Sequence, residues 1–133
     1  MTKIFLDACI IIYLIEKHLI YASQIEELMD GVSDAVFCLS PLVRLQCLVM
    51  PIRTKDVQLL KLYETFFDAQ RLLAIPPEVY NQAARLRADF LGLKTPDAIH
   101  LATAEYHNCD EFWTNDNRLD KAASALVKNV LIT

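Results

Sequence analysis

Glycine is scarce in this sequence of 133 residues, occurring only at Gly31 and Gly92. No stretch is rich in Gly, Ser or Pro and no segment repeats another, which argues against a flexible linker or a repeat array. The length is typical of one domain, and a hydrophobic content of 54% is enough to build one core. We therefore expect a single domain over residues 1–133.

The sequence also lacks an excess of positive charge. Its formal net charge is −4 and its isoelectric point is near 5.3, so no overall positive field attracts a phosphate backbone. The small basic groups, Arg53 with Lys55 and Arg85 with Arg87, fit either solvated helix faces or local phosphate contacts. A nucleic-acid function would have to depend on the local chemistry of a site.

Paired cysteine motifs and membrane segments are missing as well. The cysteines Cys9, Cys38, Cys47 and Cys109 each lie in an apolar run, without a Cys-x-x-Cys pair, which is typical of buried free thiols and not of a zinc site or a disulfide framework. The apolar stretch 8–15 is too short to span a membrane, and no cleavage site follows it. We expect a cytoplasmic protein with no membrane association.

Apolar periodicity predicts alternating strands and helices. Ser40 and Pro41 are typical of a helix start, Pro51 and Gly92 of helix ends. Such alternation indicates an α/β fold with a parallel sheet covered on both faces, in which ligands bind beyond the carboxyl ends of the strands. The expected strands cover residues 4–6, 35–39, 72–75, 111–114 and 130–132; the expected helices cover 8–18, a segment around 25–31, 41–51, 57–67, 77–91, 95–106 and 119–127.

Three aspartates are expected at that edge of the sheet. Asp7 ends the first strand, Asp116 follows the strand 111–114, and Asp97 lies in the first turn of the helix that begins at Thr95 and Pro96. Neighbouring carboxylates repel one another unless a cation neutralises them, and oxygen ligands without His or Cys favour Mg²⁺ or Mn²⁺. Such an ion can activate water and stabilise a phosphoryl group, so hydrolysis of phosphodiester bonds is the leading chemistry.

Each aspartate also fits a purely structural role. Asp7 fits a helix cap, Asp97 fits a partner for the helix dipole, and Asp116 fits a residue that stabilises a turn. The argument for a metal site depends on the three residues occurring together at one edge of the sheet.

The sequence resembles the PIN-domain family, and specifically VapC-type toxins of toxin–antitoxin pairs. The resemblance covers nearly the whole chain and is carried by residues 4–16 (IFLDACIIIYLIE), 95–104 (TPDAIHLATA) and 114–116 (TND), of which the second is the most specific. It implies a three-layer α/β/α domain with about five parallel strands, and a metal-dependent endoribonuclease acting on RNA. It also implies a homodimer and a cognate VapB-type antitoxin, through which any contact with DNA would be indirect.

One position departs from the pattern of that family. The family has a Glu in the helix after the second strand, and this sequence has Gln46. An amide preserves the shape but removes one negative charge from a cation site, and it cannot act as a general base. Either the position tolerates Gln or the change weakens the nuclease, and in the second case the chain is a binding module that captures its antitoxin and acts in autoregulation.

Other residues allow two interpretations each. His100 could bind metal or move protons, or could be a packed, hydrogen-bonded histidine. Thr114 and Asn115 fit water positioning or turn formation, and Asp120 fits a reserve carboxylate or a solvated side chain. Phe112 and Trp113 fit base stacking or core packing. A further apolar stripe fits core packing, with some surface left for a partner, and comprises Leu59, Leu62, Tyr63, Phe66 and Phe67.

A third class is phosphoryl transfer on an aspartate, as in haloacid-dehalogenase-like phosphatases or response-regulator receivers. Asp7 is followed by Ala8 and Cys9, whereas the phosphatases have a second Asp two positions later, and the acidic pair typical of a receiver does not precede it. The sequence therefore argues against this class.

Overall fold

A computed structural model describes residues 1–116, 119 and 126–131, and its centre is a sheet of five parallel strands. The strand order is β3-β2-β1-β4-β5, and every neighbouring pair is parallel. The α/β class with about five parallel strands is thereby confirmed. The strands are β1 (Thr2–Leu6), β2 (Ala35–Leu39), β3 (Arg71–Leu72), β4 (Glu111–Thr114) and β5 (Val127–Asn129).

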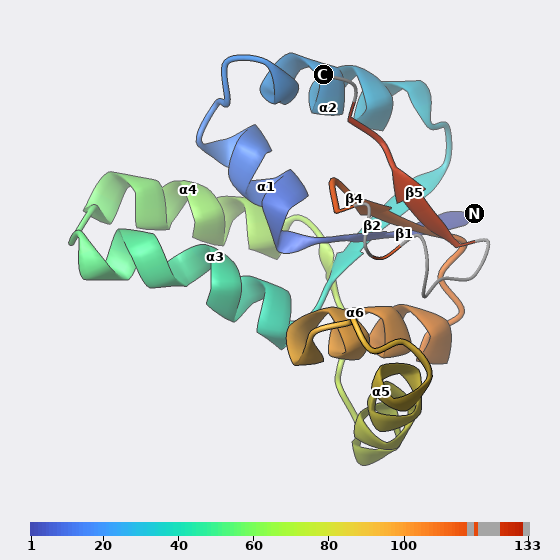
Figure 1. Cartoon of the computed structure of the whole chain (residues 1–133). Coiled ribbons are helices and arrows are strands. Elements are labelled where there is room, and N and C mark those ends of the chain that lie inside the picture. The colour runs from blue at the N-terminus through green and yellow to red at the C-terminus, as the bar shows by residue number, and fades with distance from the viewer. Residues whose placement is uncertain (117–118, 120–125, 132–133) are drawn as a thin grey trace.

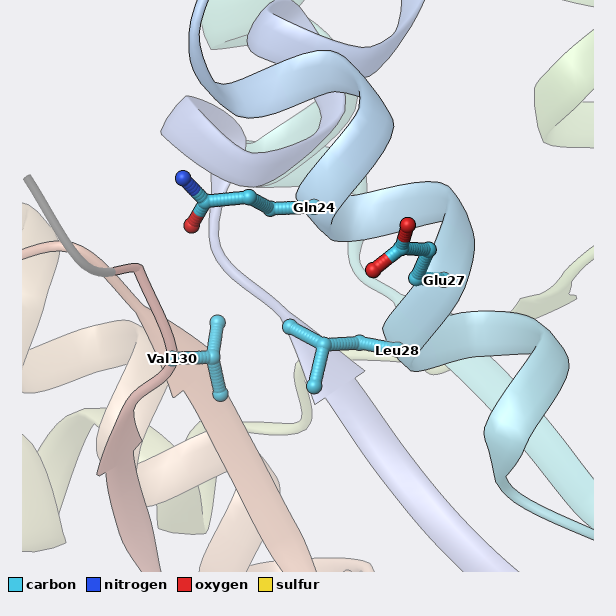
Figure 2. A pocket seen from close by; sticks show the side chains of 4 residues that line it. All are labelled: Gln24, Glu27, Leu28 and Val130. Carbon is cyan, nitrogen blue, oxygen red and sulfur yellow. The ribbon is translucent and has the colours of Figure 1, made fainter.

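Helices cover both faces of this sheet (Figure 1). Figure 1 shows α1 and α2 on one side and α5 and α6 on the other, while the α3–α4 pair extends beyond the end of β1 where α1 begins. This is the expected three-layer α/β/α arrangement. The helices are α1 (Ala8–Ile15), α2 (Tyr21–Gly31), α3 (Pro41–Arg53), α4 (Val57–Asp68), α5 (Pro77–Asp89) and α6 (Thr95–Tyr106).

The order of the strands reverses at β1. The chain adds β2 and then β3 on one side of β1, and returns with β4 to the other side. In open parallel sheets the helices diverge at such a reversal, and ligands bind there, beyond the carboxyl ends of the strands. Because Asp7 directly follows β1 and Asp116 lies just after β4, both residues flank the reversal point.

The centre of the core lies along β1 and β4. Ile4, Phe5 and Leu6 have no exposed surface, and the Phe5 ring stacks on Phe112 with 5.2 Å between the centroids. Strands buried on both faces read as continuous apolar runs, which is why β1 was recognisable. This rigid packing holds the carboxyl ends of β1 and β4 side by side.

Helix boundaries confirm one prediction about capping and correct another. The Ser40 hydroxyl accepts a hydrogen bond from the Val43 amide at 3.3 Å, as a cap before Pro41 should. The prediction that Pro51 ends α3 is wrong, because this helix includes Pro51 and continues to Arg53. Pro51 has no amide donor, but the helical hydrogen bonding continues beyond it, because the Thr54 amide donates to the Met50 carbonyl at 2.9 Å.

Other boundaries also differ from the expectation. Helix α1 ends at Ile15 and not near His18, and α5 ends at Asp89 and not near Leu91. The third strand is only Arg71–Leu72, and the last strand is Val127–Asn129 and not 130–132. In both cases the predicted run includes a buried leucine that lies just outside the strand, Leu73 after β3 and Leu131 after β5. The predicted helix 119–127 lies largely outside the described residues, and Val127 belongs to β5.

No helix among residues 1–116, 119 and 126–131 is long and apolar enough to cross a membrane.

Candidate active site at the carboxyl edge of the sheet

Asp7 connects β1, α1 and β4. Its carboxylate Oδ1 accepts the Ala8 amide at 2.8 Å, so the predicted cap of α1 is real. Its own amide donates to the Trp113 carbonyl at 3.0 Å. The side chain is only 8% exposed, although it lies at the end of a strand. A buried carboxylate needs hydrogen-bond donors or a cation around it, because burial disfavours its charge.

Thr114 joins Asp7 to Asp116. The Thr114 hydroxyl donates to Asp7 Oδ2 at 2.7 Å and accepts the Asp116 amide at 3.1 Å. Thr114 is fully buried, and Asp116 is partly buried. The structure therefore brings two of the three predicted aspartates together through one hydroxyl, a role for Thr114 that the sequence did not reveal.

Asp97 lies in the first turn of α6, as predicted, and is partly buried. Within the described ranges, no three His, Cys, Asp or Glu side chains form a group that could hold a metal ion. The gathering of Asp7, Asp97 and Asp116 around one cation therefore stays a prediction. Asp120, the reserve carboxylate, is outside the described residues.

Gln46 pairs with His100, a contact that could not be predicted from residue patterns. Gln46, on α3, has its side-chain Oε1 2.8 Å from Nε2 of His100, on α6. His100 has no exposed surface, so the interpretation as a packed, hydrogen-bonded histidine is confirmed. Burial lowers the pKa of His100, while the negative charge of Asp7 acts in the opposite direction. The residue at position 46 is thus held beside a neutral imidazole.

The cysteines near Asp7 are poor nucleophiles. Burial, reinforced by the negative charge of Asp7, raises the pKa of both Cys9 and Cys47 to about 12. Each thiol therefore stays protonated at neutral pH, and only a thiolate attacks efficiently. Cys47 instead points its sulfur at the Ala8 carbonyl, 4.0 Å away. Nucleophilic cysteine chemistry does not fit this site. The prediction of free thiols is confirmed, and Cys38, Cys47 and Cys109 are buried as expected, whereas Cys9 is partly buried.

The aromatic residues next to the site are part of the core. Phe112 has no exposed surface, and Trp113 is 2% exposed. The Trp113 indole donates to Glu111 Oε1 at 2.8 Å, which satisfies its only polar group. Core packing is therefore confirmed for both, and neither ring is available to stack on a base. On α4, Tyr63 and Phe67 are likewise buried, whereas Leu62 is exposed.

Replacing Thr114 by valine should test the bridge. Thr114→Val keeps the shape but removes the donor to a buried carboxylate, so we expect the free energy of unfolding to fall by about 1–3 kcal/mol. Chemical denaturation measures the change. The matched control is Thr103→Val on α6, whose buried hydroxyl donates to a neutral carbonyl, that of Ile99. Equal losses in the two variants would contradict a special role for the hydroxyl beside Asp7.

Comparison with known proteins identifies the family. The family model described as PIN domain matches residues 4–125, and the chain therefore belongs to the PIN-domain family. No sequence among curated proteins matches it.

Solved structures share the fold at low sequence identity. A chain of the VapBC2 complex from Rickettsia felis, solved with a DNA fragment of its promoter, has a TM-score of 0.77 and 16% identity, covering 96% of this chain and 98% of that one. VapC20 from Mycobacterium tuberculosis, a toxin that cleaves the sarcin–ricin loop, has a TM-score of 0.77 and 14% identity, with coverage of 94% and 98%. A chain of a toxin–antitoxin complex from Klebsiella pneumoniae has a TM-score of 0.76 and 20% identity, with coverage of 96% and 97%.

Proposed function

We propose that this protein is a Mg²⁺- or Mn²⁺-dependent endoribonuclease and the toxin of a toxin–antitoxin pair. The observation that carries the proposal is the Asp7–Thr114–Asp116 connection at the strand-order reversal of a PIN-domain fold. The names of the structural neighbours support the biological class, since they describe toxins, one of which cleaves RNA, and toxin–antitoxin complexes.

The donor set has the right chemistry for a hard divalent cation. Asp7, Asp97 and Asp116 offer carboxylate oxygens at or near one edge of the sheet, and such oxygens suit Mg²⁺ and Mn²⁺ better than zinc. These three residues would hold the ion, which when bound supplies an activated water and stabilises charge on the phosphate. Thr114 orients the Asp7 carboxylate, and His100 holds the side chain of Gln46.

A second candidate follows from Gln46. The position offers a neutral amide in place of the family's carboxylate, so the cation site has one negative charge fewer. A PIN domain weakened in this way would act as a binding module that captures its antitoxin and takes part in autoregulation on DNA. The two candidate functions require the same fold and differ in whether the protein cleaves RNA.

The proposed partners are an RNA substrate, a cognate VapB-type antitoxin and a second copy of this chain, in the cytoplasm. Exposed apolar side chains on α3 and α4 support the proposal that a partner protein covers these helices. Single exposed apolar residues are ordinary, but several on neighbouring elements are typical of a protein–protein interaction surface. These side chains are Leu45, Val49, Met50, Ile52, Val57 and Leu62.

Titration with Mn²⁺ tests the proposal. If the aspartates bind the ion, the folded chain should be stabilised by about 2.7 kcal/mol at a Mn²⁺ concentration 100 times the dissociation constant. Thermal unfolding with and without Mn²⁺ measures this, and cleavage of a structured RNA is followed in the same samples, with EDTA as the control. Stabilisation with cleavage supports the nuclease, and stabilisation without cleavage supports the binding module. No stabilisation at millimolar Mn²⁺ would reject the metal site.

A further inference from the structure

The contact between Gln46 and His100 determines what position 46 can offer to a ligand. The two side chains meet at 2.8 Å between α3 and α6, and Gln46 is partly buried whereas His100 is fully buried. The imidazole also packs against Phe5 on β1, with 6.0 Å between the ring centroids. The imidazole is therefore held in place by the core, and Gln46 is the side chain that has to adjust to it.

The imidazole of His100 carries a single proton. Burial disfavours the charged form of a histidine and lowers the pKa of His100, and this effect outweighs the opposing negative charge of Asp7. A neutral ring has one N–H donor and one bare nitrogen acceptor. The location of that one proton therefore decides how the amide of Gln46 is turned.

The second ring nitrogen indicates where the proton lies. Nδ1 of His100 is buried and has no hydrogen-bond partner among the described residues. A proton on Nδ1 would leave a buried N–H donor without an acceptor, and such orphaned donors are rarer in proteins than under-used acceptors. A proton on Nε2 avoids this cost, because Nε2–H donates to the carbonyl oxygen of Gln46. The contact geometry thus favours the Nε2–H form.

We propose that His100 is a positioning residue that occupies the amide oxygen of Gln46 and leaves its NH₂ group to bind an anionic ligand. Position 46 then acts as a hydrogen-bond donor to a phosphate oxygen, where a glutamate would act as an acceptor or bind a cation. The identity of the anion as RNA phosphate rests on the proposed nuclease function. The orientation of the amide does not depend on that function.

Nuclear magnetic resonance tests the orientation in the unsubstituted chain. Long-range ¹H–¹⁵N correlation spectra should show His100 with a protonated Nε2 and a bare Nδ1. His18 and His107 provide internal references for that form: Nδ1 of His18 accepts two backbone amides, and Nε2 of His107 contacts the Ala74 carbonyl. A protonated Nδ1 on His100 would overturn the proposal.

Two substitutions at position 100 test whether the histidine orients the amide. His100→Gln keeps a donor near the place of Nε2, and His100→Met removes it while keeping an apolar core. We expect the side-chain NH₂ resonances of Gln46 to stay close to their original positions in His100→Gln and to move in His100→Met, with thermal unfolding confirming that both variants are folded. Unchanged Gln46 resonances in folded His100→Met would overturn the positioning role.

Binding of single-stranded RNA in EDTA tests the ligand. Gln46→Glu and His100→Met should each weaken binding by about fivefold or more, consistent with the loss of one hydrogen bond to a charged group, and His100→Gln should retain it. Gln58→Glu on exposed α4 is the control for added charge. Equal binding by all variants would overturn the donor role of Gln46. Failure of the unsubstituted chain to bind RNA would count against the nuclease proposal instead, while the resonance experiments still decide the orientation.

Discussion

Gln46→Glu should raise the rate of Mn²⁺-dependent RNA cleavage by about tenfold or more, which corresponds to a barrier lowered by about 1.4 kcal/mol. The added carboxylate restores one negative charge to a site proposed to hold a divalent cation, and it supplies an acceptor that a general base requires. His100 can still donate from Nε2 to one carboxylate oxygen, because Glu and Gln have nearly the same shape. The measurement is initial cleavage rate at a fixed Mn²⁺ concentration.

The same substitution has the opposite expected effect without metal. In EDTA, Gln46→Glu should weaken RNA binding because it loses the NH₂ donor, whereas with Mn²⁺ it should increase turnover. A general effect of charge would act in one direction under both conditions. Gln58→Glu on the exposed surface of α4 should change neither quantity appreciably. If Gln46→Glu cleaves RNA no faster than the original chain, the view that Gln46 weakens the nuclease is wrong.

Asp97→Asn should reduce Mn²⁺-dependent cleavage by about 100-fold or more, since a metal site provides several kcal/mol of transition-state stabilisation. Asp97 is a better choice than Asp7 for this test. Asp7 is buried, caps α1 and accepts the Thr114 hydroxyl, so changing it would mix loss of chemistry with loss of stability. Asp97 is partly exposed in the first turn of α6, where the helix dipole favours its negative charge by about 0.3–1 kcal/mol.

The control for Asp97→Asn is Asp89→Asn. Asp89 is the last residue of α5 and is exposed, so Asp89→Asn removes the same charge from a residue that is not among the proposed metal ligands. Cleavage rates and thermal unfolding are measured for both variants. The metal-binding role of Asp97 would be refuted by a folded Asp97→Asn protein that cleaves RNA as fast as Asp89→Asn in the same Mn²⁺ buffer.

Local residue patterns were sufficient to predict a strand where the buried residues are also the residues that pair in the sheet. The apolar runs of β1, β2 and β4 and the Ser40-Pro41 start of α3 were predicted correctly, because buried strands and helix caps leave a direct residue pattern. The strands β3 and β5 were misplaced by the same reasoning. Leu73 and Leu131 are buried but lie beyond the paired residues, and an apolar pattern reports burial without reporting which backbone groups pair.

The aspartates could be predicted from the sequence because each follows or begins a recognisable element. Asp7 and Asp116 come after strands and Asp97 lies in the first turn of a helix, as predicted, while their gathering around one cation stays a prediction. The hydrogen bonds of Thr114 could not be predicted from the sequence. Thr114 reaches Asp7 across 107 positions of sequence, and its hydroxyl connects the Asp7 carboxylate to the backbone amide of Asp116.

By itself, the sequence determined the α/β class, the family resemblance, the places of Asp7, Asp97 and Asp116 relative to strands and helices, and the presence of Gln at position 46, because these follow from residue identity and short-range periodicity. Only the tertiary structure decided which side chains act on one another. The packing of α3 against α6 brings Gln46 to His100, and the pairing of β1 with β4 brings Asp7 to Thr114. Burial is then the main cause of the shifted pKa values of His100, Cys9 and Cys47, since the cost of removing charge from water depends on all the surrounding elements and not on any local segment.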